Sequence, residues 1–285
     1  MYLKNVSEYL GFLFVTFLVK RLSVEAASRL GGFVLRAIGP KTRRHRVTLQ
    51  NIASAFPEKS DKECENIALD MWEFLGRVFS ESIKLDVIAR EGRVTIDPVS
   101  LNALPKDQSF IVAGAHQGNW EVAAIAGSHL NANFTGIYRA FRNPFVDRSV
   151  FLVRKPFYPG GLWKKGAQSA VRALRCLKSG GSIAVLADVH DRRGVPGMFF
   201  GRPTKSSSFP ALAAYVTGRP LFAAEVIRCP DVHFIIRLTE VRFDRSRSKD
   251  IAVSEATLLL QSLIEASVRE NPGQWLWSSN RWVRG

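Results

Sequence analysis

The chain of 285 residues carries 40 Lys and Arg against 25 Asp and Glu, a formal net charge of +15. Its composition, 46% hydrophobic and 23% charged residues, excludes a disordered chain. Three scattered cysteines without a CxxC pair exclude a disulfide framework and a zinc ribbon. A chain this basic is expected to bind nucleic acid, an anionic lipid surface or an acidic protein.

The positive charge is concentrated in two stretches. Residues 1–50 hold nine Lys and Arg against two Glu, and residues 139–165 hold seven against one Asp. The uncharged run 9–19 is too short to span a membrane, which needs about 20 apolar residues. Apolar helices flanked by basic residues are typical of a chain lying in a membrane interface, on the cytoplasmic side. The alternative is a buried N-terminal helix with a solvated basic face.

Apolar periodicity and capping residues predict the elements in chain order. Helices are expected over residues 2–20, 23–38, 42–55, 60–84, 119–129, 144–155, 166–179, 209–217 and 252–270, with Ser23 and either Ser60 or Asp61 as caps. Strands are expected over residues 109–114, 134–138, 182–187, 221–227 and 232–243, with a glycine-rich loop from 188 to about 205. This alternation predicts an α/β fold with a central mixed, mostly parallel sheet flanked by helices. Residues 1–40 are expected to form an N-terminal helical, membrane-associating extension of a domain covering 41–285.

The most informative motif follows the strand predicted at 109–114. His116 stands at its carboxyl end, where α/β sheets bind ligands, with Gly118 and Glu121 shortly after it. On one continuous helix His116 and Glu121 would not share a face, so they meet only if a bend at Gly118 separates them. A carboxylate on one imidazole nitrogen would leave the other nitrogen free to accept a proton from a substrate hydroxyl. A surface or capping pair is the alternative interpretation.

At these residues the chain resembles the bacterial lipid A biosynthesis acyltransferases. The His116–Glu121 segment is similar to the HxxxxD/E motif of lipid acyltransferases, in that family's H-x-G-N-W-E form. Further blocks that are similar to the family's are residues 51–60, 75–81, 138–154 (Tyr138-Arg139, Arg142-Asn143-Pro144, Arg154), 186–204 and 272–282. The resemblance departs at Gly273, where the family usually has Glu, and at Ser278-Ser279-Asn280, where it usually has His-Arg.

The resemblance implies an O-acyltransferase in which His116 deprotonates an acceptor hydroxyl and Glu121 is its partner. The hydroxyl oxygen then attacks the thioester of an acyl donor. Arg154 matches the family's arginine that clamps or polarises in the site, and Arg139 is a weaker candidate for the same task. Backbone N–H groups near Gly118 and Asn119 are expected as alternative oxyanion donors.

Two acidic residues complete the predicted site. Asp188 directly follows the strand predicted at 182–187 and is therefore expected at the same sheet edge as His116. It is expected to orient a basic group or to shape the pocket. Asp191 is an alternative candidate for the same role. Asn119, Arg139, Asp188 and Asp191 are accordingly assigned to substrate binding.

The same resemblance implies the partners. The donor is expected to be acyl carrier protein, an acidic protein that would dock on the basic stretch 139–165, or a CoA thioester. The acceptor is expected to be a lipid A precursor, acylated late in synthesis at the cytoplasmic face of the bacterial inner membrane, whose anionic surface suits the N-terminus. No cofactor and no metal site are expected.

Other interpretations stay open from the sequence. A non-enzymatic basic protein of the membrane surface fits the charge, whereas no motif supports nucleic-acid binding. A metal-dependent hydrolase using His116, Glu121, His190 and Asp191 lacks the HExxH spacing. An acyltransferase for another glycolipid or an aminolipid is the nearest alternative.

Overall fold

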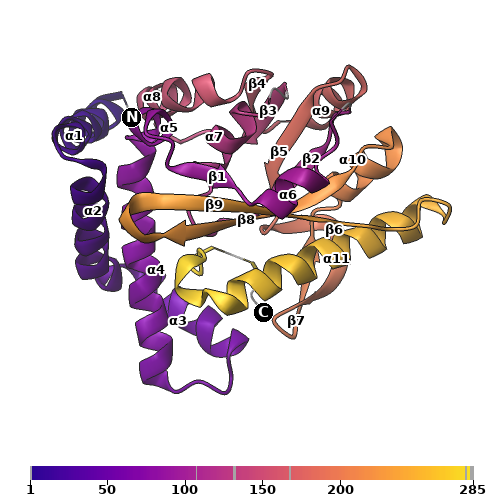
Figure 1. Cartoon of the computed structure of the whole chain (residues 1–285). Coiled ribbons are helices and arrows are strands. Elements are labelled where there is room, and N and C mark those ends of the chain that lie inside the picture. Colours follow the sequence, from indigo (N-terminus) through magenta and orange to yellow (C-terminus); the bar gives the residue numbers. More distant parts are fainter. Residues whose placement is uncertain (1, 107, 131–132, 167, 280, 283–285) are drawn as a thin grey trace.

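A computed structural model describes residues 2–106, 108–130, 133–166, 168–279 and 281–282 (Figure 1). The α-helices are α1 (Tyr2–Arg21), α2 (Val24–Ile38), α3 (Arg43–Ala55), α4 (Asp61–Ser82), α5 (Leu85–Arg90), α6 (Pro98–Ala103), α7 (Ala123–Ser128), α8 (Pro144–Arg154), α9 (Ser169–Lys178), α10 (Phe209–Thr217) and α11 (Lys249–Glu270). The strands are β1 (Val94–Ile96), β2 (Ile111–Gly114), β3 (Phe134–Tyr138), β4 (Gly161–Lys164), β5 (Ser182–Leu186), β6 (His190–Phe199), β7 (Arg202–Ser206), β8 (Leu221–Cys229) and β9 (His233–Glu240). Short 3-10 helices lie at Gly39–Lys41, Lys155–Phe157, Pro230–Val232 and Pro272–Gln274.

One sheet organises the described residues, with strand order β1-β9-β8-β2-β5-β3-β4. Neighbouring strands are parallel except β8 and β9, which pair antiparallel. Helices lie on both faces of the sheet (Figure 1). The expected α/β class with a mixed, mostly parallel sheet is therefore confirmed. Because β2, β5, β3 and β4 run in one direction, their carboxyl ends meet along one edge.

Each face of the sheet has its own hydrophobic core. In β2 the side chains alternate, because successive residues of a strand point to opposite faces. Ile111 and Ala113 belong to the core under α9, α10 and α11, and Val112 packs against the core under α5 and α7. A strand buried on both faces is uninterruptedly apolar, and this property made the segment recognisable in the sequence.

Two helix starts are confirmed with their caps. The Ser23 hydroxyl accepts a hydrogen bond from the Ala26 N–H at the start of α2. At the start of α4, Ser60 and Glu63 form a reciprocal capping box, in which each side chain accepts from the other residue's backbone N–H.

Two expectations along the chain are wrong. The stretch from 188 to 205 is mostly the antiparallel β6–β7 hairpin, whose glycines and Pro196 hide the strand alternation. Phe200 and Gly201 turn the hairpin with φ of +52° and +66°. The helix expected at 119–129 begins only at Ala123, because residues 119–122 form turns. The sequence patterns also missed α5, α6, β1 and β4, which are short.

The helices α2 and α4 are in backbone contact. A Cβ atom on Gly31 would lie 2.4 Å from the Gly76 carbonyl oxygen, and one on Gly76 would lie 2.0 Å from that of Gly31. The glycine pair thus lets the two helices cross closely, and α2 is anchored to the fold. The proposed domain boundary at residue 40 stays a prediction.

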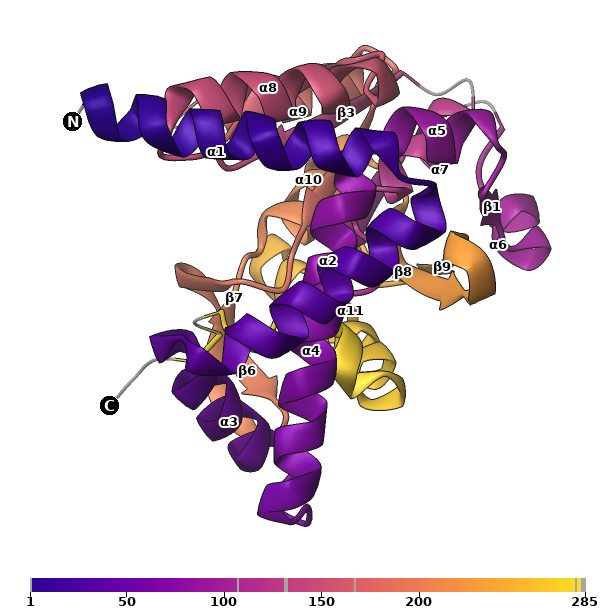
Figure 2. The same cartoon turned by 90° about the vertical axis from the view of Figure 1, so that its left-hand side faces the viewer.

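The first helix, α1, lies alongside α8 at the edge of the molecule (Figure 2). Tyr9 packs on Phe145 with ring centroids 5.5 Å apart, and the Asn143 amide donates to the Asn5 carbonyl at 2.8 Å. At the end of α1, the Lys84 ammonium donates to the carbonyls of Lys20 and Leu22. Most apolar side chains of α1 stay exposed: Tyr2, Leu3, Leu10, Leu13, Phe14, Val15, Phe17 and Leu18. This arrangement contradicts the alternative of a buried N-terminal helix.

Of the described helices, α11 is the one that is long and apolar enough to cross a membrane by length and composition. Nearly half of its apolar window, 44%, is buried in the fold. Ala252, Ala256 and Leu260 are fully buried in the core against the sheet. We therefore describe α11 as a core helix.

Candidate active site

Two neighbouring strands bring the central pair of side chains together. His116 follows β2 and Asp188 follows β5, and these strands are in parallel register up to Gly114 and Leu186. The Ala187 N–H donates to the Gly114 carbonyl at 2.8 Å, which extends the pairing beyond the strands. The prediction that His116 and Asp188 share a sheet edge is confirmed.

The carboxylate of Asp188 holds His116 at two points. Its Oδ1 lies 2.8 Å from the imidazole Nδ1, and its Oδ2 accepts from the His116 backbone N–H at 2.8 Å. The indole N–H of Trp275 also donates to Oδ2, at 2.8 Å. Asp188 is only 2% exposed, whereas the imidazole is 25% exposed and lines a cavity. An Nδ1–H bonded to the carboxylate leaves Nε2 as the proton acceptor.

The surroundings shift the acidity of both groups. Burial alone would lower the pKa of His116, but the charge and hydrogen bond of Asp188, with a smaller effect of Glu121, raise that pKa above its usual value. Burial would raise the pKa of Asp188, but the His116 charge and the hydrogen bonds to His116 and Trp275 lower it. Asp188 therefore stays ionised, and the imidazole is a stronger base than in water.

The predicted contact between His116 and Glu121 is wrong. Glu121 instead accepts from Arg154 through both oxygens, with the Arg154 Nε at 2.6 Å from Oε2 and Nη2 bonded to Oε1. Arg154 reaches it from the end of α8. A paired guanidinium cannot be deprotonated in a protein, so this carboxylate anchors a fixed positive charge.

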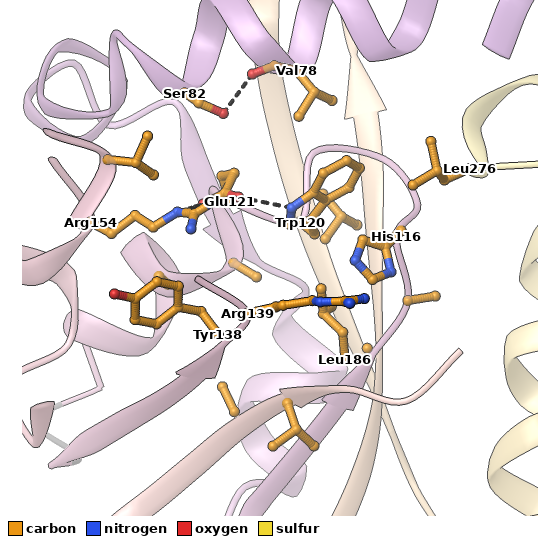
Figure 3. A pocket seen from close by; sticks show the side chains of 18 of the residues that line it. Val78, Ser82, His116, Trp120, Glu121, Tyr138, Arg139, Arg154, Leu186 and Leu276 are labelled. Atoms are coloured by element: carbon orange, nitrogen blue, oxygen red, sulfur yellow. Dashed lines mark hydrogen bonds and ion pairs between the residues drawn. The ribbon is translucent and has the colours of Figure 1, made fainter. Parts of the chain in front are cut away.

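Trp120 lies between His116 and the Glu121–Arg154 pair, as Figure 3 shows. Its indole N–H donates to the Glu121 Oε1 at 2.9 Å, and its ring lies edge-on to the imidazole, with centroids 5.2 Å apart. Glu121 thus influences the pKa of His116 through its charge rather than by direct contact.

Asn119 does not line the cavity, contrary to its expected role in substrate binding. It is fully buried, its side-chain N–H donates to Glu81 Oε2 at 2.7 Å, and its Oδ1 accepts from the Glu121 N–H at 3.1 Å. Glu81, from α4, forms a bidentate ion pair with Arg228 at 2.8 and 2.6 Å and accepts from the Ser28 hydroxyl at 2.6 Å. This buried network ties the turn after β2 to α2, α4 and β8.

The turn itself needs glycine at position 118. Gly118 has φ of +54°, and a Cβ atom there would lie 2.1 Å from the Val226 carbonyl oxygen. The turn therefore rests directly on β8, and side chains on either side of Gly118 point in different directions.

The C-terminal segment braces the same turn. The Gly118 N–H donates to the Gln274 carbonyl, and the Leu276 N–H donates to the His116 carbonyl, both at 3.1 Å. Trp275, fully buried, supplies the indole that fixes Asp188. Glu81 and Trp275 lie in the segments 75–81 and 272–282 that resemble the family's blocks, but the sequence assigned neither a role and gave no indication of Arg228. The one available signal was that such blocks recur far apart in the chain.

A cavity of about 1630 Å³ extends from this pair. Its wall is largely apolar and includes side chains of α1, α4 and α8, among them Phe12, Leu13, Phe79, Val150 and Val153. Figure 3 shows part of this wall, with Leu186 and Leu276 beside His116. The arrangement places one basic nitrogen at the polar end of a large hydrophobic space.

The other two predicted site residues, Arg139 and Asp191, both line the cavity. Arg139 is exposed on the rim and extends towards His116 (Figure 3). Asp191 also lines the cavity, where it accepts from the Arg193 N–H at 3.0 Å. Within the described ranges, no group of three His, Cys, Asp or Glu side chains is placed to hold a metal ion. Asn280, part of the departing C-terminal block, lies outside the described residues.

The chain is similar to a solved structure and to a sequence family. No curated protein sequence matches the chain. Among solved structures, the 1-acyl-sn-glycerophosphate acyltransferase PlsC from Thermotoga maritima is similar at 14% identity and a TM-score of 0.39, over 70% of this chain and 83% of that one. The sequence profile of the bacterial lipid A biosynthesis acyltransferases matches residues 2–284, essentially the whole chain. This chain therefore belongs to the family of bacterial lipid A biosynthesis acyltransferases.

Proposed function

We propose that this acyltransferase moves a fatty acyl chain from an acyl carrier protein thioester to a hydroxyl of a lipid A precursor, late in its synthesis. The observation that carries the proposal is the His116–Asp188 pair at the polar end of the large apolar cavity. Ordinary small-molecule pockets have volumes of about 300–1,000 Å³. A space of about 1630 Å³ suits a substrate of lipid size.

His116 is the general base in this mechanism. Its Nε2 takes the proton of the acceptor hydroxyl, and the oxygen attacks the thioester carbonyl carbon. The tetrahedral intermediate then collapses, the C–S bond breaks, and the leaving thiolate takes the proton back from the imidazolium. Asp188 is a positioning residue: it fixes the tautomer and stabilises the protonated ring, as the carboxylate does in a Ser-His-Asp triad, while the substrate hydroxyl takes the place of the serine.

Arg154 is our candidate for stabilising the oxyanion. Glu121 engages its Nε and Nη2 and so fixes the plane of the guanidinium. Nη1 donates to no residue in the described part of the chain, and Arg154 lines the cavity. A preorganised cation of this kind stabilises developing negative charge without reorganising.

The basic stretch 139–165 is our candidate surface for the acidic carrier protein. Arg154 and Lys164 have carboxylate partners, Glu121 and Asp147 respectively. Three exposed cations of the stretch have no ion-pair partner among the described residues and lie outside the cavity: Arg142, Arg148 and Lys155. Exposed unpaired cations of this kind accelerate encounter with an acidic partner.

The membrane-facing surface in our proposal combines α1 with the outer face of α2, at the cytoplasmic side of the inner membrane. Phe14 and Phe17 of α1 and Phe33 of α2 are 63%, 54% and 71% exposed. Both helices lie on the side that faces the viewer in Figure 2. Apolar side chains next to Lys20 and Arg21 fit an interface of anionic lipids.

The function is tested by incubating the purified chain with acyl carrier protein thioesters and a lipid A precursor and analysing the lipids by mass spectrometry. We expect one additional acyl chain on the precursor with wild type and none above background with His116→Ala. Acyl-CoA in place of the carrier protein distinguishes the donors. Absence of acylation by folded wild-type enzyme with either donor would refute the proposal.

A second acceptor class, another glycolipid or an aminolipid, is favoured by one observation. Ser278 and Ser279, where the resemblance leads one to expect larger basic side chains, both line the cavity. The second departure is explained by packing, because a Cβ atom on Gly273 would lie 2.7 Å from that of Asp70. Lipid profiles of cells lacking and overproducing the chain distinguish the acceptors, since a change in species other than lipid A would identify the second class.

A further inference from the structure

We propose that Arg139 and Lys165, together with the N-terminus of α9, form a phosphate-binding subsite on the rim of the cavity. The inference rests on the proposed function, because the phosphate would be carried by one of its two substrates. The subsite would hold the anionic group of a substrate beside the His116–Asp188 pair, at which the reaction takes place.

The two cations are neighbours through the sheet. Arg139 follows β3 and Lys165 follows β4, and the parallel register of these strands pairs Tyr138 with Lys164. The Lys165 N–H donates to the Tyr138 carbonyl at 2.7 Å, so the pairing continues to the point where both side chains leave the sheet. Both residues line the same cavity as His116.

Neither Arg139 nor Lys165 binds another side chain in the part of the chain that the structure describes. The neighbouring Lys164 binds Asp147 at 2.7 Å, and Arg154 binds Glu121. Arg139 and Lys165, in contrast, are exposed and have neither an ion-pair partner nor a side-chain hydrogen bond among the described residues. Two adjacent cations repel each other when no carboxylate lies between them. An anion that binds both would remove this repulsion.

The helix α9 adds oriented backbone donors at the same place. It begins at Ser169, its N-cap Gln168 makes no capping hydrogen bond, and no acidic residue occupies its first turn. Ser169 and Ala170 line the cavity together with Lys165. The Ser169 N–H is bonded to the Gly166 carbonyl at 3.1 Å. The positive end of the helix dipole favours phosphate at this place and reinforces the two side-chain cations.

The charge balance of the cavity supports an anionic ligand. Its described lining carries five cationic side chains, from Lys20, Arg44, Arg139, Arg154 and Lys165, and the two carboxylates of Glu121 and Asp191. Arg154 neutralises Glu121, and Asp191 accepts from the Arg193 N–H. A phosphate monoester, with nearly two negative charges at neutral pH, complements the excess.

The position of Arg139 gives the subsite a catalytic consequence. Its side chain extends towards the side of the cavity where His116 lies (Figure 3). A phosphate held there would fix the distance between the anionic group of a substrate and its reacting atom, so binding energy would be converted into orientation. The phosphate has two chemical sources: a sugar phosphate monoester on the lipid acceptor, or the phosphopantetheine arm of the donor, whose phosphate is a diester with a single negative charge.

The test compares two double variants with the same loss of charge. Arg139→Gln/Lys165→Gln removes the subsite, and Arg175→Gln/Lys178→Gln removes two exposed cations further along α9 that do not line the cavity. Calorimetric titration uses two soluble probes, phosphopantetheine and a deacylated, phosphorylated glucosamine disaccharide, each also in its dephosphorylated form. Acyl transfer is measured in parallel with the full-length enzyme.

We expect the subsite variant to bind one phosphorylated probe roughly 10- to 100-fold more weakly, as loss of charge-assisted hydrogen bonds implies. The control variant and the dephosphorylated probes should show no such difference, and the affected probe identifies the source. Unchanged binding of both probes, or equal weakening in the control variant, overturns the inference even when acyl transfer proceeds. If the subsite variant alone binds a phosphorylated probe more weakly but the wild-type enzyme transfers no acyl chain, the subsite is supported and the proposed function is refuted.

Discussion

Two buried carboxylates, Asp188 and Glu121, lie near the imidazole of His116 but bind different partners. Asp188 contacts His116, whose imidazole can gain and lose a proton, and Glu121 contacts Arg154, which stays charged. Asp188 lies 72 residues from His116 in the chain, whereas Glu121 lies only five residues away. Strand order in the sheet, rather than proximity in sequence, therefore decides which carboxylate controls the base.

The comparison predicts separate consequences for the two carboxylates. Changes around Asp188 should alter the chemistry and its pH dependence, and changes around Glu121 should alter the placement of Arg154 and the stability of the site.

The largest effect is expected for His116→Ala. Loss of the general base should lower acyl transfer by roughly 10²- to 10⁴-fold. The variant should stay folded but unfold at a lower temperature, because Asp188, only 2% exposed, loses its imidazole partner. Rates measured with saturating donor and circular dichroism of the same sample check both statements; near wild-type rates would eliminate His116 as the base.

Glu121→Gln should combine a smaller loss of rate with a loss of stability. It leaves the guanidinium of Arg154, whose side chain is 17% exposed, without its carboxylate, which costs roughly 2–4 kcal/mol. Denaturant unfolding of Glu121→Gln, Arg154→Gln and the double variant measures the coupling between them. Additive effects of the two substitutions would contradict the pairing.

Asn119→Ala tests the support beneath the turn. It removes the hydrogen bonds to Glu81 and to the Glu121 N–H, and a buried group left unsatisfied costs about 1–3 kcal/mol. Because Asn119 does not line the cavity, we expect kcat to fall several-fold while KM for the acceptor stays unchanged. A selective increase in KM would instead assign Asn119 to substrate binding.

The smallest effect on chemistry is expected for Phe14→Ser/Phe17→Ser in α1. Each exposed phenylalanine that enters a membrane interface contributes about 1.5–3 kcal/mol at full burial, so vesicle binding should fall at least tenfold. Activity on detergent-dispersed substrates should persist. Sedimentation with anionic vesicles is the measurement, with Phe33→Ser of α2 examined in parallel; unchanged sedimentation of the α1 variant would assign membrane binding to another surface.

Much of the fold could be predicted because its signals are local. Continuous apolar segments ending in glycine or a polar residue marked β2 and β5, and capping residues marked the starts of α2 and α4. The β6–β7 hairpin could not be predicted in this way. Its tip depends on a contact distant in sequence, in which the Phe200 N–H donates to Glu265 of α11 at 2.6 Å.

The candidate site was only partly predictable for a similar reason. The ends of two predicted strands placed His116 and Asp188 on one edge, but the choice between Asp188 and Glu121 depends on the direction of the turn at Gly118. That direction is set by Val226 beneath it and by the network of Glu81 with Arg228, residues 147 positions apart. No short-range pattern in the sequence reports such a contact.

The central claim, that Asp188 controls the basicity of His116, is tested most directly by the pH dependence of kcat/KM. Because the base must be neutral and its pKa is raised above 6.5, activity should fall as the pH decreases through an inflection above 6.5 in wild type. In Asp188→Asn the lowering effect of burial remains without the carboxylate charge, so the inflection should move to lower pH, with a smaller move in Glu121→Gln. An inflection that stays in place in Asp188→Asn, or that moves further in Glu121→Gln, would contradict the account.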